Sequence, residues 1–348
     1  MLTGLKAQHV SSIQYLARAT AAEVTGCTIG SQSIEFRPRL SPADLINRNI
    51  KIKAESAGSL LLVFQALLPF LLFAGDDSGS SITITIQGGT NVSFSLSFEY
   101  LDQVLLPALE RFGVTVDRRL ESRGWSLGTS QLGSVRFQIV PLPVGQTLKA
   151  PAWPTERGTI TEIAISIIVP EYAIKAIKNS LLLRINLVFP GAETYYHLVE
   201  DSRHKARFYT LLVAHTSSGL KFGRDWLYNR TTKNKTPEEL GTEIAQKVVD
   251  DLDTELEKGG LVDEYLQDQL VVFQALAAGS SSIPGTSAAL SSDRVRVDRT
   301  DEPFGDGSTH TTTARWVASQ LLPHAKWIDN GRLCEGVGWK ASPTTFMN

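Results

Sequence analysis

The chain has 348 residues, enough for one large domain with a smaller one beside it. A content of 42% hydrophobic and 20% charged residues excludes a globally disordered chain, and the net charge of −2 excludes an overall positive field that would attract nucleic acid. Any contact with nucleic acid must therefore come from a local basic patch. Cys27 and Cys334 lie far apart and form no metal-ligand pair, which is typical of a reducing compartment, so we expect a location in the nucleus or cytoplasm.

Helical and strand-like hydrophobic patterns alternate along the first half of the chain. Apolar residues recur at helical spacing from Val10 to Val24, and Gly26 is expected to end that helix. The apolar stretch 60–74 contains Gln65 and Pro69 and is shorter than the roughly 20 residues of a membrane-spanning helix, so it predicts a buried core helix and no membrane partner. The same patterns predict strands at 29–36, 50–52 and 82–86 and a helix at 98–112.

The second half continues the alternation. A helix is predicted to begin at Thr236, because Pro237 and Glu239 complete a capping box, and to end near 259–260. A further helix at 263–278 should lead into a surface loop at 280–292 that is rich in serine and glycine. The remaining predictions are strands at 114–116, 135–139, 160–169, 181–189 and 208–214, a turn at 217–219, a charged and valine-rich segment at 294–298, a last helix at 311–322 and a closing strand or hairpin at 327–339.

These elements indicate a mixed α/β class, which can also be described as α+β. A helix followed by a pair of strands occurs after Gly26 and again after Gly113, and this recurrence suggests a repeated α/β unit.

Charge divides sharply in the second half. Residues 203–235 hold eight Lys or Arg against the single acidic residue Asp225, with aromatic residues between them, whereas residues 236–268 hold eleven Asp or Glu against two lysines. The basic stretch could bind an RNA backbone, but a hairpin with charged outer and aromatic inner positions would look the same. The acidic stretch could be a solvated helical face or a partner for the basic one. The candidate RNA-binding residues are Arg203, Lys205, Arg207, Lys221 and Arg224.

Eight short blocks occur in order along most of the chain, at 4–9, 30–38, 57–69, 88–91, 107–113, 123–124, 157–158 and 262–270. In this order and at roughly this spacing they resemble the RNA 3'-terminal phosphate cyclase family. The resemblance implies repeated βαβ-type units that form a large domain, at 1–168 and 233–348, with a smaller α/β domain inserted at 169–232.

The resemblance also implies chemistry. Family enzymes use ATP and a divalent metal, Mg or Mn, to convert the 3'-phosphate of RNA 3' ends into a 2',3'-cyclic phosphate through a histidine-AMP intermediate. By position, the nucleotide would be bound by Gln8, Gln65, Tyr265, Asp268 and Gln269. On a helix, Tyr265, Asp268 and Gln269 share one face, because residues three and four apart are neighbours. The alternative interpretation is a core tyrosine beside two exposed polar residues.

Two departures from the family pattern bear on activity. The chain begins after the position of the family's strand and glycine-rich loop, so we expect that loop to be missing from this sequence. The family's catalytic histidine matches Trp316, and an indole cannot take up AMP as an imidazole does. His310 lies six residues upstream, and we consider it as a replacement nucleophile or as a surface histidine.

Three functional hypotheses follow. The first is a family enzyme that acts on RNA with ATP, with activity impaired at the histidine position. The second is a non-catalytic relative that binds RNA or ribosome-assembly proteins. The third is a small-molecule enzyme built on similar repeated units, as in enolpyruvyl-transferring enzymes.

Overall fold

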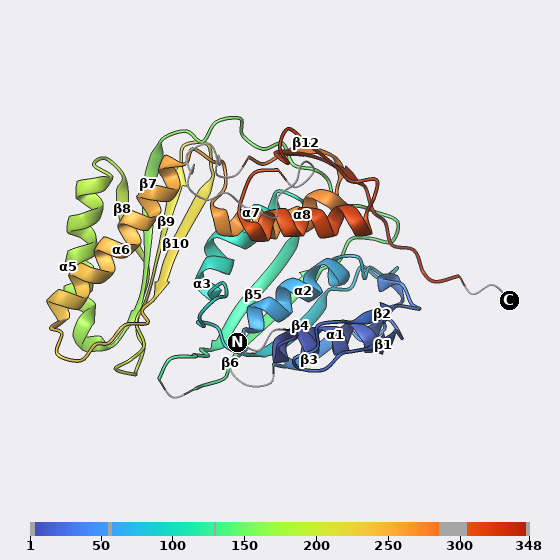
Figure 1. The fold of residues 1–348 in the computed structure, drawn as a ribbon, viewed down its shortest axis with the longest axis horizontal. Helices are drawn as coiled ribbons and strands as arrows, with labels where there is room; N and C mark the ends of the chain where they lie inside the picture. The colour runs from blue at the N-terminus through green and yellow to red at the C-terminus, as the bar shows by residue number, and fades with distance from the viewer. Residues whose placement is uncertain (1–3, 55–57, 129, 285–304, 346–348) are drawn as a thin grey trace. The chain divides into compact units, whose positions relative to one another are not determined.

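The computed structural model describes residues 4–54, 58–128, 130–284 and 305–345 (Figure 1). The chain divides into two compact units, which we describe separately. The first unit consists of Met1–Leu101, Gly113–Leu148 and Trp339–Asn348, and the second of Asp102–Phe112 and Lys149–Gly338. Both units combine helices with β-sheets, so the expected α/β class is confirmed.

The first unit is built on a four-stranded sheet of order β3-β4-β6-β5, in which β3 and β4 are parallel and the other pairs are antiparallel. A shorter antiparallel pair, β1 with β2, follows the first helix. The elements in chain order are α1 (Ala7–Ala19), β1 (Glu23–Thr25), β2 (Glu35–Arg37), η1 (Pro42–Asp44), β3 (Asn49–Lys53), α2 (Leu60–Leu72), β4 (Ile82–Gly88), α3 (Phe98–Tyr100), β5 (Thr115–Ser122) and β6 (Gly133–Val140).

The helix α2 forms the core of the first unit, as the apolar stretch 60–74 predicted. It begins after Ser59, whose hydroxyl accepts a hydrogen bond from the amide of Leu62, and it buries eight of its residues. Phe64 of α2 stacks on Phe137 of β6 with ring centroids 4.0 Å apart. Among the residues described, no helix combines the length and the apolar character needed to cross a membrane.

The second unit contains a four-stranded sheet of order β10-β9-β7-β8 and a three-stranded sheet of order β11-β13-β12. In the first of these sheets β7 and β8 are parallel, and β9 is antiparallel to both β7 and β10. The elements in chain order are η2 (Leu101–Leu105), α4 (Leu106–Glu110), β7 (Ile160–Val169), α5 (Glu171–Val188), β8 (Glu193–Asp201), β9 (Tyr209–Thr216), β10 (Lys221–Leu227), α6 (Pro237–Glu257), α7 (Glu264–Leu276), β11 (Ala278–Ser282), α8 (Thr309–Leu321), β12 (Lys326–Ile328) and β13 (Leu333–Val337).

One face of the four-stranded sheet in this unit is covered by α5 and α6, which lie side by side in Figure 1. Alternate residues of β7, including Ile163 and Ile165, point into this core because side chains on a strand alternate between faces. The predicted capping box at Thr236 and the predicted turn at 217–219 are both present, the latter joining β9 to β10. The helices predicted at 263–278 and 311–322 and the closing hairpin are confirmed as α7, α8 and β12–β13.

The predicted strand at 181–189 is wrong, because residues 181–188 belong to the helix α5 and Phe189 is its C-cap. Ala173, Ile177, Leu181 and Ile185 recur every four residues, and all four are fully buried, which is the periodicity of a helix face. The short window from Leu181 onward is apolar enough to resemble a strand when it is taken alone.

The boundaries of the other predicted elements differ less from those in the structure. The loop predicted at 280–292 is wrong in its first residues, because 280–282 belong to β11, which pairs with β13. The rest of that prediction from 285 onward, and the segment 294–298, lie outside the described residues. The helix predicted at 98–112 is present as α3, η2 and α4, of which η2 is a π-helical segment. No strands were predicted at the positions of β1, β8 and β10.

The predicted insert at 169–232 lies inside the second unit. Its strands β8, β9 and β10 form one sheet with β7, which starts before the insert, and α6 follows it. The division into a large domain and an insert stays a prediction.

The helical assignment of α5 can be tested by two alanine substitutions. In a strand Leu181 and Leu183 would share a face, whereas in the structure Leu181 is fully buried and Leu183 is 75% exposed. We expect Leu181→Ala to lower the free energy of unfolding by about 2–5 kcal/mol and Leu183→Ala to change it by less than about 0.5 kcal/mol. Urea denaturation measures both, and equal losses would contradict the helix.

Candidate functional site

The helix α7 carries the block 262–270, and its first turn is fixed by Asp263. This carboxylate is fully buried and caps the helix, with Oδ1 accepting hydrogen bonds from the amides of Tyr265 and Leu266, each at 3.0 Å. Its Oδ2 accepts a hydrogen bond of 2.9 Å from the amide of Gly223 on β10. A carboxylate at a helix N-terminus is favoured by the free amides and by the helix dipole. Asp263 therefore both starts α7 and ties it to the sheet.

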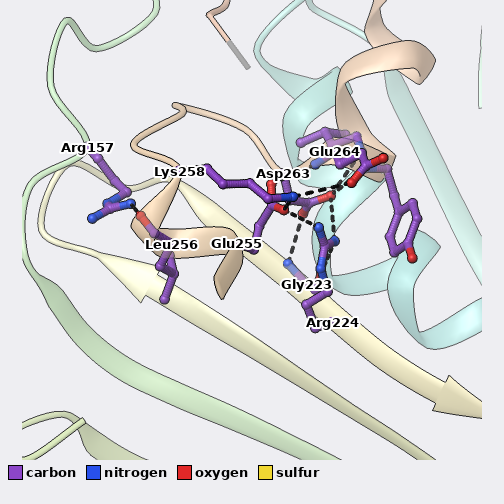
Figure 2. A network of polar contacts seen from close by, with 10 residues as sticks. Arg157, Gly223, Arg224, Glu255, Leu256, Lys258, Asp263 and Glu264 are labelled. Atoms are coloured by element: carbon purple, nitrogen blue, oxygen red, sulfur yellow. Dashed lines mark hydrogen bonds and ion pairs between the residues drawn. The ribbon is translucent and has the colours of Figure 1, made fainter. Parts of the chain in front are cut away.

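A buried group of charges surrounds this cap (Figure 2). Arg224 of β10 donates to Oε2 of Glu255 at the end of α6, and its Nη1 lies 3.7 Å from Oδ1 of Asp263. Oε1 of Glu255 accepts a hydrogen bond of 2.9 Å from the amide of Glu264, and Lys258 lies 2.9 Å from Oε2. Loss of one partner would leave the others buried without compensation. The group thus joins β10, α6 and α7.

The face of α7 predicted from its helical spacing is present. Tyr265 is 50% exposed, and the guanidinium carbon of Arg224 lies 4.4 Å from the centroid of its ring. Asp268 is partly buried, and its Oδ1 accepts a hydrogen bond of 2.9 Å from the side-chain amide of Gln269. The structure thus gives Tyr265 and Asp268 specific partners, and the binding of a nucleotide by this face stays a prediction.

Burial raises the pKa of the Asp268 carboxyl to about 6, because the charged form is poorly solvated. The hydrogen bond from Gln269 and the charge of His310 act in the opposite direction. His310 therefore lies close enough to Asp268 to affect its titration. A carboxyl group with a strongly shifted pKa is a feature of many functional sites.

His310 and Trp316 both lie on α8, which packs against α7 (Figure 1). The helix begins after Ser308, whose hydroxyl accepts a hydrogen bond of 3.1 Å from the amide of Thr311, so His310 is in the first turn. Trp316 is 49% exposed. Six residues separate the two positions, which corresponds to about 120° around the helix, and they face different directions.

Gln8 and Gln65 belong to the first unit, where Gln8 lies in the first turn of α1 and Gln65 lies in the middle of α2. These two helices pack against each other. The convergence of these glutamines with the residues of α7 on one nucleotide stays a prediction.

Two of the family-like blocks are joined by buried polar contacts within the first unit. The Nδ2 of Asn91 donates a hydrogen bond of 2.8 Å to the buried Glu99, which also forms an ion pair of 2.5 Å with Arg123. A Cβ atom on Gly124 would lie 2.1 Å from the carbonyl oxygen of Gly88. The blocks 88–91 and 123–124 therefore act in this structure as a buried connection between loops.

The five candidate RNA-binding residues differ in exposure. Arg203 and Lys205 are exposed and Lys221 is partly so, and their RNA binding stays a prediction. Arg207 and Arg224 are each only 6% exposed, and Arg224 is engaged by Glu255, so burial leaves little of either side chain accessible, and their RNA binding also stays a prediction. For Arg224 the cause is that β10 packs against α6, which brings this arginine to Glu255.

The acidic stretch is in part a partner of the basic one, as one of the two interpretations proposed. Besides the pair of Arg224 with Glu255, both Arg230 and Lys235 form ion pairs with Glu243. The individual roles of Glu255 and of Arg224 beneath Tyr265 were not predicted. The opposed charges of the two stretches were the available signal, but they did not identify the pairs.

A pocket in the second unit lies on the side of α7 that carries Leu266. Arg111 reaches it from α4, donating a hydrogen bond of 2.8 Å to the carbonyl of Gly219 and lying 5.0 Å from the ring centroid of Trp153. Its other lining residues are mainly apolar. Tyr265, Asp268 and Gln269 do not line this pocket.

The shifted pKa of Asp268 predicts a pH-dependent stability. Between the unfolded pKa near 4 and the folded pKa of about 6, the folded protein binds more protons, so stability falls as the pH rises. Relative to Asp268→Asn, we expect the free energy of unfolding of the wild type to fall by about 2–3 kcal/mol from pH 4 to pH 7. Denaturation of both proteins at each pH tests this, and parallel pH profiles would contradict it.

Comparison with known proteins supports one family throughout. A family model described as RNA 3'-terminal phosphate cyclase matches residues 2–325. The chain is 28% identical to an RNA 3'-terminal phosphate cyclase of Drosophila melanogaster, over 91% of this chain and 79% of the relative, and 30% identical to one of Staphylothermus marinus, over 93% and 82%. A Dictyostelium discoideum protein with the name "Probable RNA 3'-terminal phosphate cyclase" is 28% identical over 80% of this chain and 62% of its own length. The chain belongs to the RNA 3'-terminal phosphate cyclase family.

Proposed function

We propose that this protein binds ATP and RNA 3'-phosphate ends in RNA processing, and that His310 acts in place of the family's histidine to form the covalent AMP adduct. The observation that carries the proposal is the packing of α8, which holds His310, against α7, which holds Asp268 in the block that resembles the family's nucleotide-binding segment, with an electrostatic influence of His310 on the Asp268 carboxyl. A nearby carboxylate can orient an imidazole for attack.

The cyclisation reaction of the family has three steps. An unprotonated imidazole nitrogen attacks the α-phosphorus of ATP, and pyrophosphate leaves. The RNA 3'-phosphate then attacks the same phosphorus and releases the histidine, which yields an RNA end that carries AMP. The neighbouring 2'-hydroxyl attacks the RNA phosphate, AMP leaves, and the cyclic phosphate remains. Trp316 cannot perform the first step, because the nitrogen lone pair of indole is part of its aromatic system.

A divalent metal would neutralise charge on the triphosphate during the first step. Within the described ranges of the chain, no three His, Cys, Asp or Glu side chains form a group that could hold a metal ion. Magnesium is usually bound through substrate phosphates and only one or two carboxylates, so the ion would arrive with ATP. The described side chains therefore offer no cluster of three or more metal ligands, and phosphates of ATP would have to supply ligands.

The adenylylation step can be tested with ATP labelled at the α-phosphate. We expect the wild type to retain label in the presence of Mg²⁺, and His310→Asn to lose at least 100-fold of it, because removal of a nucleophile abolishes the covalent route. Trp316→His places an imidazole at the family position and should raise labelling. Label that survives His310→Asn would assign another nucleophile, and label found only in Trp316→His would show that the natural chain does not form the adduct.

The second candidate function is binding of RNA or of ribosome-assembly proteins without catalysis, and Trp316 at the family's histidine position favours it. In this case the nucleotide site and the exposed basic residues would serve recognition alone.

RNA binding has its own test on the exposed residues of the loop between β8 and β9. We expect the double change Arg203→Ala and Lys205→Ala to weaken binding of a 3'-phosphorylated RNA about tenfold, because two phosphate contacts would be lost. The matched control is Lys51→Ala with Lys53→Ala, which removes two exposed lysines from β3 of the first unit. Fluorescence anisotropy with labelled RNA measures both, and equal losses in the two variants would refute a local binding surface.

A further inference from the structure

We infer that the pocket beside Leu266 binds a small organic carboxylate, whose charged group is held by Arg111 and Trp153 and whose short apolar body enters the hollow. The residues that line this pocket all belong to the second unit. None of the five candidate nucleotide-binding residues lines it, so this inference does not depend on the proposed function.

The guanidinium of Arg111 is held at the pocket by two contacts. Its Nη2 donates a hydrogen bond of 2.8 Å to the carbonyl of Gly219, in the turn between β9 and β10, and its central carbon lies 5.0 Å from the ring centroid of Trp153. A guanidinium carries five N–H donors, and the bond to Gly219 uses one of them. No carboxylate among the described residues forms an ion pair with Arg111, so its charge is available to an anion.

Trp153 contributes a second donor to the same place. Its Nε1 is buried, and no described atom accepts a hydrogen bond from it. A buried N–H without an acceptor costs free energy, and such groups are rare in folded proteins. An indole nitrogen can only donate, so the partner that it lacks is an acceptor atom. Because Arg111 lies over the same ring, an anion at this place would meet two donors.

The rest of the lining selects the kind of anion. Lys221 at the start of β10 adds a second positive charge, and no Asp or Glu is found among the described lining residues. An inorganic phosphate would bring polar oxygens against the walls, which is costly because the walls cannot form hydrogen bonds through their side chains. The lining therefore suits an anion that is apolar at its other end. The buried apolar walls are formed by Val104, Leu220, Leu261, Val262 and Leu266.

The size of the pocket limits the apolar end of the ligand. Its volume is about 80 Å³, whereas a cavity of about 150 Å³ holds benzene. An apolar body of about three or four carbon atoms is therefore the largest that suits it. A carboxylate supplies two acceptor oxygens, one for Arg111 and one for Trp153. Isobutyrate, a carboxylate on an isopropyl group, has this form and serves as the probe.

The indole proton of Trp153 reports binding directly. The chain has six tryptophans, and the indole signal that is lost in Trp153→Phe identifies this one in a ¹H–¹⁵N spectrum. Isobutyrate at constant ionic strength should shift the signal to saturation, because the N–H gains an acceptor, with a dissociation constant of about 1–10 mM for so few atoms. Isobutyramide, which lacks the charge, and inorganic phosphate, which lacks the apolar body, should each bind about tenfold more weakly.

A change at Arg111 tests the charged end. Arg111→Gln removes the charge and keeps a side-chain donor for Gly219, and we expect it to weaken isobutyrate binding about tenfold. The matched control is Arg230→Gln, since Arg230 also lies over an indole, 5.3 Å from the ring centroid of Trp226, but does not line this pocket. The control should leave the affinity unchanged. Thermal unfolding of both variants is followed in parallel.

A Trp153 signal that does not respond to isobutyrate at about 100 mM overturns the inference. An equal response to isobutyramide or to phosphate also overturns it, because the pocket would then not recognise a charge on an apolar body. Equal affinity of Arg111→Gln and the wild type contradicts the role of Arg111 and the inference with it. If Arg111→Gln unfolds, the comparison of the three ligands on the wild type decides, since it needs no variant.

Discussion

The second unit depends on the burial of two carboxylates, Glu255 and Asp263, at the point where α6 ends and α7 begins. Burial of a charge is costly unless cations and amide donors compensate it. Arg224 and Lys258 supply the positive charge, and backbone amides of Gly223, Tyr265 and Leu266 supply hydrogen bonds. The requirement to satisfy these two groups sets the start of α7 and therefore the direction of every side chain on that helix.

The candidate site is a consequence of this arrangement. Once the first turn of α7 is fixed, Tyr265 and Asp268 face the same side, and the packing of α8 brings His310 near Asp268. The shifted pKa of Asp268 then follows from its burial. Trp316, one and two-thirds turns further along α8, faces elsewhere and stays half exposed.

Sequence patterns over a few neighbouring residues predicted many of the helices and strands. Features that depend on contacts between residues far apart in the sequence were not predicted. The capping box at Thr236 and the helix start at Asp263 were read correctly because capping depends on residues a few positions apart. The prediction of a strand at 181–189 was wrong because a short apolar window does not distinguish a helix from a strand unless the flanking residues are considered as well. The burial of Arg224 could not be predicted, because it depends on which strand of the hairpin faces α6 and α7. The family-like blocks identified α7 before any geometry was known.

Because the basic and acidic stretches form ion pairs, the number of basic residues in 203–235 overstates the positive charge available to bind RNA. Three of the eight basic residues in 203–235, namely Arg224, Arg230 and Lys235, are already paired with Glu255 or Glu243. A cation that is neutralised within the protein displaces few condensed counterions from a polynucleotide. The dependence of RNA affinity on ionic strength should therefore be weaker than eight basic residues would give, and a slope taken from the sequence alone would be too steep.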